Sequence, residues 1–459
     1  MDGGDLTGSG SGAPADRSGG PPARQQTLRD DLGSVAHPRR SGRLALTSSA
    51  GRDAFSARAL NHPIRSLTVI YLLTRIAALG AIAIAAHWFQ SPAGVGNLHP
   101  TVSDLLGLWD AQWYERIATG GYPQPLPVDP VSGRITYSAW AFFPLFPTLL
   151  RPLLALGLPF EAAALLLNFG LGWVAMVLIW RIFGLAVHAA PQFQRDRLAL
   201  VAAALWCFYP ATGILLVPYS EALAVVLIVA AIVLLLRRSY WAASGVLLLL
   251  GFTRAVAPAV GIVVLTHLVA RWREEGRGMP FRGERLPVLA LCASVAISAI
   301  AWPVTVGWLT GRPTAFFDVQ AAWGQRPQEG PFVLWLVWAW AERGLFGLVL
   351  IVLIVAAYLS LVAGRHGRWM PLEVRAWALA YPLYLLAVVR PITSMWRFLL
   401  LDFPIAALLA SVAMRTSTGG KIVAHWRRRL LPLVLPLVLG MVWWTVTFLT
   451  FVPWDDSPP

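Results

Sequence analysis

The stretch PYSEALAVVLIVAAIVLLLRR, residues 218–238, decides the fold of this 459-residue chain. Every residue between Glu221 and Arg237 is Ala, Val, Leu or Ile, and charge occurs only at the two ends. A helix that is apolar on all sides is buried in protein or in lipid, because none of its faces suits water. The stretch therefore predicts a membrane-spanning helix, with polar residues at both of its ends.

The rest of the chain repeats this pattern. Hydrophobic residues make up 57% of the sequence and charged residues only 13%, whereas soluble domains carry about 25% charged residues. We therefore predict an all-α polytopic membrane protein, with its spans in one domain at 61–453. Clear apolar runs lie near 65–88, 161–187, 198–218, 221–236, 286–309, 345–363, 376–389, 397–414 and 430–452.

A further apolar stretch, 240–270, is too long for one span and holds Thr253 and Arg254 near its middle. An arginine at the centre of a bilayer is costly. We therefore predict two shorter helices here, with Arg254 at the turn between them. The predicted number of spans is then about eleven.

The ends of the chain and its charge fit this class. Residues 1–60 are rich in Gly, Ser, Ala, Pro and Arg, which predicts a disordered cytoplasmic tail, and 454–459 would form a short outer tail. The net charge of +14 is almost all arginine, placed between apolar runs. This pattern indicates the positive-inside rule of membrane proteins and not nucleic-acid binding. Cys207 and Cys292 lie in apolar runs and are interpreted as packing residues.

The arginines also predict sidedness. With the N-terminal tail in the cytoplasm, most of them fall on the cytoplasmic side, provided that 139–157 does not cross the membrane. This segment, AWAFFPLFPTLLRPLLALG, has three prolines and Arg151, which favour a re-entrant or interfacial course. The polar residues left unexplained then share the outer face: Asp110, Glu221, Arg254, Arg390, Arg397, and a loop at 310–331 with Asp318, Gln320, Trp323 and Gln325. A single outward-facing polar site, covered by loops, is the simplest explanation for these polar residues.

The first outer loop contains GLWDAQWYERIATGGYP, residues 107–123. Ser103 or Asp104 can cap a helix that begins just before it, and Gly120 with Gly121 can end that helix. An apolar stripe recurs every four residues, at Leu105, Trp109, Trp113 and Ile117. The spacing predicts one helix in the membrane interface, anchored by its tryptophans.

Asp110 lies beside this stripe, and anchoring does not explain it. A carboxylate near the bilayer surface is disfavoured unless it is used. Glu115 lies about 140° farther around the helix and does not form an acid–base pair with Asp110. We interpret Glu115 and Arg116 as part of a solvated polar face.

The other outer polar residues each have a structural alternative. Glu221 would cap the next helix, where its charge suits the helix dipole. Arg254 would either extend to the lipid headgroups or bind a phosphate as a bidentate fork. Arg397 would pair with Asp402 near a turn, and Arg75, well inside the first span, requires a partner in the bundle.

Several motifs are absent from the sequence. There is no Walker A loop, no HExxH, no GxSxG and no Asp-x-Asp triplet of the kind that holds a metal on a nucleotide diphosphate. We therefore predict no metal site and no cofactor. An outer carboxylate with several outer arginines fits a hydroxyl deprotonated by a base while an anionic lipid phosphate leaves.

These residues also carry a resemblance to a known family. WDAQWYERIATGGYP followed by AFFPLFP resembles the signature of the PIG-V family of mannosyltransferases and its bacterial relatives. PYSEAL, GFTRAVAP and SMWRFLLLDFP resemble later motifs of that family, in the same order, over roughly residues 65–414. The sequence departs from the family pattern at Ala222, in place of a small hydroxyl residue, and at Phe398, in place of tyrosine.

The resemblance implies a GT-C fold and an inverting transfer of a hexose, mannose in that family, from a polyprenyl-phosphate sugar at the extracytoplasmic face of the cell membrane. It implies Asp110 as the catalytic carboxylate, with Arg254 and Arg397 serving the donor phosphate or the structure of the site. We assign Arg390 to the same group. Residues expected to bind substrate or support the site are Trp109, Gln112, Tyr219, Glu221 and Ser394. The expected partners are the lipid donor, membrane lipids and an extracytoplasmic acceptor, and the Ala/Arg-rich composition argues against a GPI substrate.

Two other functions remain open. The chain would be a transporter or flippase of a lipid-linked glycan if its polar residues lay near the bilayer midplane of an internally repeated fold. No convincing repeat occurs in the sequence. It would be a non-catalytic subunit if a partner enzyme carried the chemistry.

Overall fold

The computed structural model describes residues 62–185, 192–275, 281, 283–325, 330–415, 422 and 425–452. All of them belong to one compact unit, Phe55–Pro459, and none to the other unit, Met1–Ala54. The tails predicted at 1–60 and 454–459 lie outside the described residues. Within these residues every regular element is a helix, apart from two isolated bridges, Val128–Ile135 and Arg415–Ile422. The all-α class is thus confirmed.

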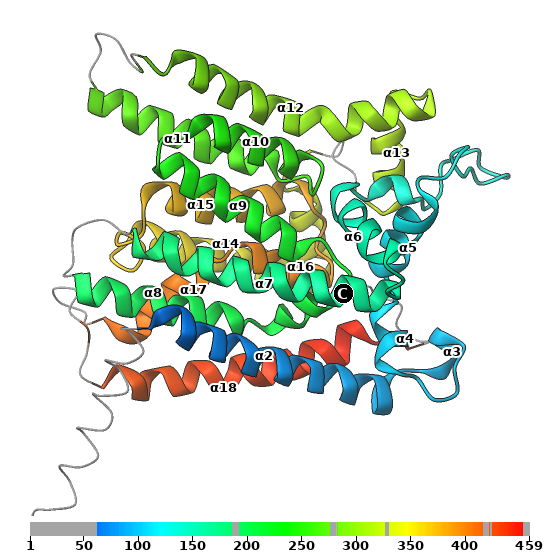
Figure 1. The fold of residues 1–459 in the computed structure, drawn as a ribbon, viewed down its shortest axis with the longest axis horizontal. Helices are drawn as coiled ribbons and strands as arrows, with labels where there is room; N and C mark the ends of the chain where they lie inside the picture. Colours follow the sequence, from blue (N-terminus) through cyan, green and yellow to red (C-terminus); the bar gives the residue numbers. More distant parts are fainter. Residues whose placement is uncertain are drawn as a thin grey trace, which may run out of the picture. The chain divides into compact units, whose positions relative to one another are not determined.

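The longer helices run side by side in Figure 1, and the short elements α3 to α6 and α13 gather at one end of them. We call the end of the long helices where these short elements gather the loop end, and the opposite end the far end. The longer helices are α2 (Pro63–Ile84), α7 (Phe160–Gly184), α8 (Gln192–Cys207), α9 (Glu221–Leu236), α10 (Tyr240–Gly251), α11 (Ala257–Glu275), α12 (Arg285–Thr310), α14 (Val333–Ala363), α15 (Leu372–Val388), α17 (Pro404–Met414) and α18 (Trp426–Trp444).

The shorter elements connect these helices or extend them. They are η1 (Ala85–Phe89), α3 (Pro92–Val95), α4 (Val102–Leu106), α5 (Asp110–Gly120), η2 (Ala139–Ala141), α6 (Leu145–Ala155), η3 (Pro210–Leu216), α13 (Ala315–Ala322), α16 (Met395–Phe398), η5 (Leu399–Leu401) and η6 (Thr445–Leu449). The irregular backbone of the described unit is therefore concentrated where helices break and at the loop end.

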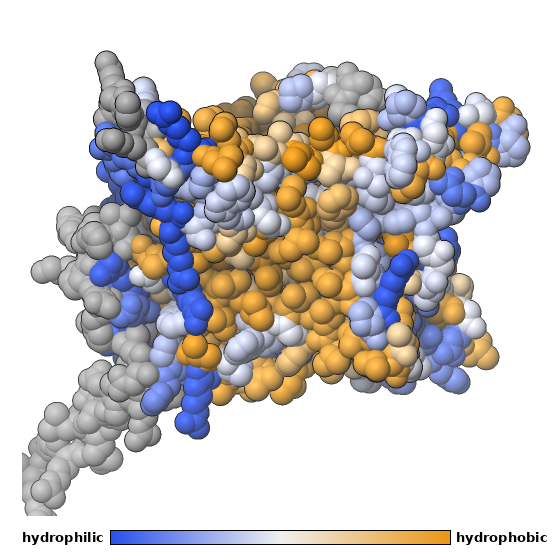
Figure 2. Space-filling model, turned by 45° about the horizontal axis from the view of Figure 1, so that its top comes forward, coloured by the Kyte–Doolittle hydropathy of each residue, from blue (hydrophilic) through white to orange (hydrophobic). Residues whose placement is uncertain are grey.

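The apolar composition produces two kinds of helix. α9 packs against α7 and α10, and most of its residues, from Glu221 to Leu235, are buried. α14 packs mainly on α15 and exposes large apolar side chains such as Leu350 and Ile354. An exposed apolar helix face is unfavourable in water and suits lipid. Figure 2 shows the corresponding apolar belt, with hydrophilic residues on either side of it.

Five helices are long and apolar enough to cross a membrane: Pro63–Phe89, Phe160–Gly184, Arg285–Thr310, Val333–Ala363 and Trp426–Leu449. Two bent pairs are long enough when each is taken as one span. They are Arg195–Cys207 with Pro210–Leu216, bent by 74°, and Met395–Leu401 with Pro404–Met414, bent by 78°. The described residues thus form a helical membrane protein with five to seven candidate spans.

The predicted number of about eleven spans is not confirmed. α9 and α10 have 16 and 12 residues, fewer than the roughly 20 that a crossing helix needs. α11 ends in the charged sequence RWREE, and α15 has 17 residues and begins with Leu-Glu-Val-Arg. The sequence predicts such helices as membrane spans because a helix buried in protein is as apolar as a helix buried in lipid.

One predicted interruption agrees with the structure. α10 ends at Gly251 and α11 begins at Ala257, so the stretch 240–270 is broken around Arg254 as expected. Segment 139–157 forms η2 and the 11-residue helix α6, which packs on α5 at the loop end. At about 1.5 Å per residue, α6 has roughly half the length of a crossing helix.

Arg75 has a structural partner, as its position required. The bend between α8 and η3 leaves backbone carbonyls without helical hydrogen bonds. Arg75 donates to the carbonyls of Cys207, at 3.1 Å, and Thr212, at 2.6 Å, and to the Thr212 hydroxyl, at 2.6 Å. This buried arginine therefore stabilises a broken helix.

The single interfacial helix predicted for the first loop is instead two helices. α4 begins with a capping box between Thr101 and Asp104, and α5 begins at Asp110 and ends before Gly121, which has φ 79°. The chain breaks between them because Trp109 has a φ of 58°, which no helix permits. The break interrupts the expected apolar stripe.

The stripe residues contact protein. Ile117 is buried, the ring of Trp109 packs on Phe451, and Trp113 stacks on Phe142. Packing at the loop end of the bundle therefore accounts for these contacts, and membrane anchoring by the tryptophans stays a prediction.

Candidate functional site

Four charged side chains from distant parts of the sequence meet at the loop end. Arg397 Nη1 lies 2.6 Å from Asp110 Oδ2 and 3.3 Å from Glu221 Oε1. Arg254 Nη1 lies 2.9 Å from the same oxygen of Glu221. We call Asp110, Glu221, Arg254 and Arg397 the site cluster. The structure thus brings together four of the polar residues that the sequence analysis placed on one face.

Each member of the site cluster stands where regular backbone stops or starts. Asp110 and Glu221 are the first residues of α5 and α9, where the helix dipoles favour negative charge. Arg254 lies in the turn between α10 and α11, and Arg397 lies in the four-residue helix α16. The cluster therefore depends on three breaks between apolar segments and on the first loop.

Neutral side chains complete the cluster. The backbone N–H of Asp110 donates to the Tyr219 hydroxyl, at 3.2 Å, and the Arg397 guanidinium lies over the Tyr219 ring, 4.8 Å from its centroid. The Tyr114 hydroxyl donates to Ser220 Oγ, at 3.0 Å, which also accepts from Arg254 at 3.5 Å. These contacts fix the start of α5 on the turn that precedes α9.

Sequence reasoning missed several of these supporting residues. Phe398 is one, because both guanidinium groups lie over its ring, that of Arg254 at 4.7 Å and that of Arg397 at 5.0 Å. Asn168 is another: its amide nitrogen donates to the carbonyls of Val217 and Tyr219 and so holds the turn before α9. A lone asparagine within the apolar run of α7 was a signal that could have identified it.

Burial makes the site cluster energetically demanding. The side chain of Glu221 is 0% exposed, that of Arg397 8% and that of Asp110 14%. Glu221 Oε2 has no hydrogen-bond partner among the described residues. A buried ion pair gains little net stability over apolar packing, because desolvation offsets the Coulomb attraction. Stability alone is thus a poor explanation for two carboxylates and two guanidinium groups at this place.

Trp109 connects the cluster to a strained backbone. Its φ of 58° and ψ of −127° belong to a region that glycine adopts far more readily. Such a conformation costs a residue with a side chain about 1–3 kcal/mol and persists only where the surroundings impose it. The strain lies directly before Asp110, so it sets the direction in which the carboxylate leaves the backbone.

Three further predicted site residues have different positions. Ser394 is buried, and its hydroxyl accepts from Arg397 at 3.5 Å, which places it beside the cluster. Arg390 is exposed and lies against Gly324 and Gln325, so the structure joins it to the 310–331 loop and not to the cluster. Gln112 faces away from the cluster, into a separate pocket.

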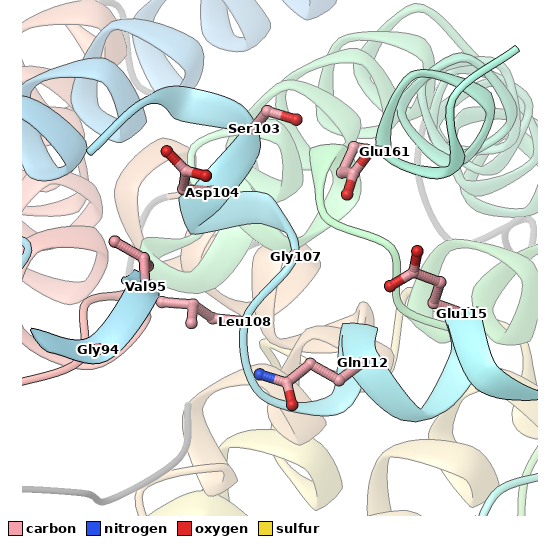
Figure 3. Close-up of a pocket in the computed structure, with 9 residues that line it drawn as sticks. All are labelled: Gly94, Val95, Ser103, Asp104, Gly107, Leu108, Gln112, Glu115 and Glu161. Carbon is pink, nitrogen blue, oxygen red and sulfur yellow. The ribbon is translucent and has the colours of Figure 1, made fainter. Parts of the chain in front are cut away.

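Figure 3 shows this pocket, which α4 and α5 line together with the start of α7. Its side chains include the carboxylates of Asp104, Glu115 and Glu161. Burial, and then the nearby Glu161 carboxylate, raise the pKa of Glu115. The pocket measures about 270 Å³, just below the range of about 300–1,000 Å³ usual for small-molecule sites. It is acidic and therefore unsuited to a phosphate.

Asp402 does not pair with Arg397, contrary to one structural alternative. Its carboxylate is buried, and Oδ2 lies 2.6 Å from the Tyr358 hydroxyl. The ion pairs of Arg397 are instead with Asp110 and Glu221 in the site cluster. Among the described residues, no group of three or more His, Cys, Asp or Glu side chains has an arrangement that could hold a metal ion.

The site cluster can perform acid–base chemistry next to an anion. A carboxylate that is partly accessible, like that of Asp110, can accept a proton, and two guanidinium groups on one side of it can bind phosphate oxygens. No model of a known protein family matches the chain, and no curated protein matches it significantly.

Proposed function

We propose that the chain is a membrane glycosyltransferase that transfers a hexose from a polyprenyl-phosphate sugar to an extracytoplasmic acceptor, with inversion at the anomeric carbon. The observation that carries the proposal is the site cluster, in which a carboxylate that is 14% exposed, Asp110, shares Arg397 with a fully buried one, Glu221. The resemblance of the surrounding motifs to PIG-V mannosyltransferases supports mannose as the sugar.

In the proposed reaction the lipid phosphate binds first. Its oxygens take positions on Arg397 and Arg254, where bidentate hydrogen bonds to guanidinium are favourable. The phosphate competes with Asp110 for Arg397, so donor binding releases the Asp110 carboxylate from its ion pair. Glu221 stays between the two arginines and holds them at their spacing.

Asp110 then accepts the proton of the acceptor hydroxyl. The acceptor oxygen forms a bond to the anomeric carbon on the face opposite the phosphate, and the bond from that carbon to the phosphate oxygen breaks. The electron pair leaves with the polyprenyl phosphate, whose developing charge the two arginines stabilise. A single displacement of this kind inverts the configuration.

The test compares Asp110→Asn with Glu115→Gln, a matched amide substitution on the exposed side of the same helix. Transfer from polyprenyl-phosphate mannose would be measured in membranes that contain equal amounts of each folded protein. We expect Asp110→Asn to lose transfer and Glu115→Gln to retain it. Near-normal transfer by Asp110→Asn would contradict the proposal, as would labelling that reached Asp110 alternately from both sides of the membrane, which is the behaviour of a transporter.

A further inference from the structure

A segment from the end of the described chain contacts the residue before Asp110. The indole N–H of Trp109 donates to the carbonyl of Leu449, at 3.1 Å, and its ring lies 5.7 Å from that of Phe451. These partners are 340 residues from Trp109 or more. The contact is therefore a tertiary one that local sequence does not provide.

The segment is itself fixed to the end of the first long helix. The Gln90 amide binds the Phe451 backbone twice, accepting from its N–H at 2.8 Å and donating to its carbonyl at 3.1 Å. The Ser91 N–H donates to the same carbonyl at 3.2 Å. A Cβ at Gly94 would overlap the Phe451 ring, so the glycine leaves room for it.

Both contacting segments lie at the ends of π-helical turns. η1 ends α2 and η6 ends α18, and the two turns contact each other. A π turn shifts the backbone register and is often found at functional sites. Here η6 ends with Leu449, whose carbonyl accepts from Trp109.

We propose that Leu449–Phe451, held by Gln90, Ser91 and Gly94, is a clamp that keeps Trp109 in its strained conformation and so places the Asp110 carboxylate on Arg397. Trp109 is then a positioning residue, because it acts on the reaction through Asp110. Loop packing by itself does not call for a large side chain at this φ, where glycine would be unstrained. The predicted effect of the clamp on catalysis rests on the proposed glycosyl transfer. Its predicted effect on the conformation of Trp109 does not.

The first test measures hydrogen exchange of the purified full-length protein in lipid nanodiscs. Trp109→Phe removes the indole N–H and keeps a ring, and Gln90→Leu removes both side-chain hydrogen bonds to Phe451. We expect the amides of Asp110 and Ala111 to exchange about tenfold faster in both variants, because the start of α5 opens more often. Trp88→Phe, at an exposed tryptophan two residues before Gln90, is the control and should leave exchange unchanged. Wild-type exchange in both clamp variants would overturn the proposal.

The second test measures transfer kinetics with polyprenyl-phosphate mannose. We expect kcat to fall about tenfold in Trp109→Phe and Gln90→Leu, with the KM for the donor unchanged, because positioning of the base is lost while the arginines remain. Unchanged kcat would overturn the clamp, and so would a raised KM with normal kcat, which would make Trp109 a donor contact. If the wild-type protein transfers no sugar, the proposed function fails, and the exchange measurement still decides on the clamp.

Discussion

Two buried polar clusters lie at opposite ends of the helical hairpin formed by α10 and α11. At the loop end is the site cluster. At the far end, His267 lies between Glu373, at 2.7 Å, and the Tyr240 hydroxyl, at 3.0 Å, and Arg271 contacts Tyr240 at 2.5 Å and Glu284 at 2.6 Å. We call these five residues the far-end cluster. Both clusters are charged and buried, yet they are built differently.

The difference lies in the backbone. The central pair of the far-end cluster, His267 and Arg271, stands one turn apart inside the regular helix α11. Their partners stand at the starts of other helices: Tyr240 in α10, Glu284 at the N-cap of α12 and Glu373 in α15. The site cluster stands on helix ends, a turn and a four-residue helix, and one of its residues follows a strained backbone. Side chains on rigid helices make a stable link, whereas side chains at breaks can exchange partners when a ligand arrives.

After the loss of transfer in Asp110→Asn, the largest effect should follow from Arg397→Ala. It leaves the carboxylates of Asp110 and Glu221 close together, with Glu221 fully buried, and removes one of the two side chains proposed to bind the phosphate. We expect kcat/KM for the lipid donor to fall about 10²–10³-fold and the free energy of unfolding to fall by about 3–5 kcal/mol. Transfer kinetics and thermal unfolding measure the two losses.

Arg397→Lys provides the control for charge. It keeps the cluster neutral but lacks the planar fork that binds a carboxylate and a phosphate together. We expect a folded protein with most of the activity lost. Wild-type kinetics of this variant would show that only the net charge of the cluster matters.

A smaller effect should follow from Arg254→Gln. This residue contacts Glu221 and Ser220 but not Asp110. The proposed base, Asp110, therefore keeps its partner, while the proposed donor site loses one of its two guanidinium groups. We expect kcat/KM for the donor to fall about 10–100-fold, equivalent to about 1.4–2.7 kcal/mol. Arg237→Gln, at the exposed far end of α9, is the matched control. Equal kinetics of the two variants would remove Arg254 from the site.

A substitution in the far-end cluster should lower stability and leave turnover unchanged. Glu373→Gln weakens the contact to His267, and we expect the free energy of unfolding to fall by about 1–3 kcal/mol. Turnover per folded molecule should remain as in the wild type, because no far-end side chain reaches the site cluster. If Glu373→Gln lost turnover but kept full stability, the purely structural role of the far-end cluster would be contradicted. The far end would then take part in function.

The smallest effect should be an acid dependence at the far end. The Phe281 N–H, and then Arg271, lower the pKa of Glu275. A carboxyl group with a lowered folded-state pKa contributes stability above its unfolded pKa of about 4.3, and this is lost as the pH falls through the folded value. We therefore expect the wild type to unfold at a higher temperature than Glu275→Gln at pH 7.

The difference between these two proteins should shrink below about pH 4, where the wild-type carboxyl becomes protonated. Glu274→Gln, at the neighbouring exposed carboxylate, is the control for a change of surface charge. A difference in unfolding temperature that stays constant between pH 7 and pH 3 would contradict this assignment.

Much of this architecture follows from the sequence. The apolar runs predict helices, Gly120 and Gly121 end α5, and Arg254 interrupts the stretch 240–270, because these are local preferences of the chain. The sequence also selects Asp110, Glu221, Arg254 and Arg397 as polar residues that their surroundings do not explain. The number of spans does not follow, since burial in protein and burial in lipid require the same apolar side chains.

Only the tertiary structure decides how the selected residues pair. Arg397 pairs with Asp110 and Glu221, and not with its near neighbour Asp402, because helix packing brings it close to residues that are 176 positions away or more. The φ of Trp109, the two guanidinium groups over Phe398 and the contact with Leu449 arise in the same way. Sequence periodicity specifies which face of a segment is apolar, whereas the meeting of two segment ends depends on the length and bend of every helix between them.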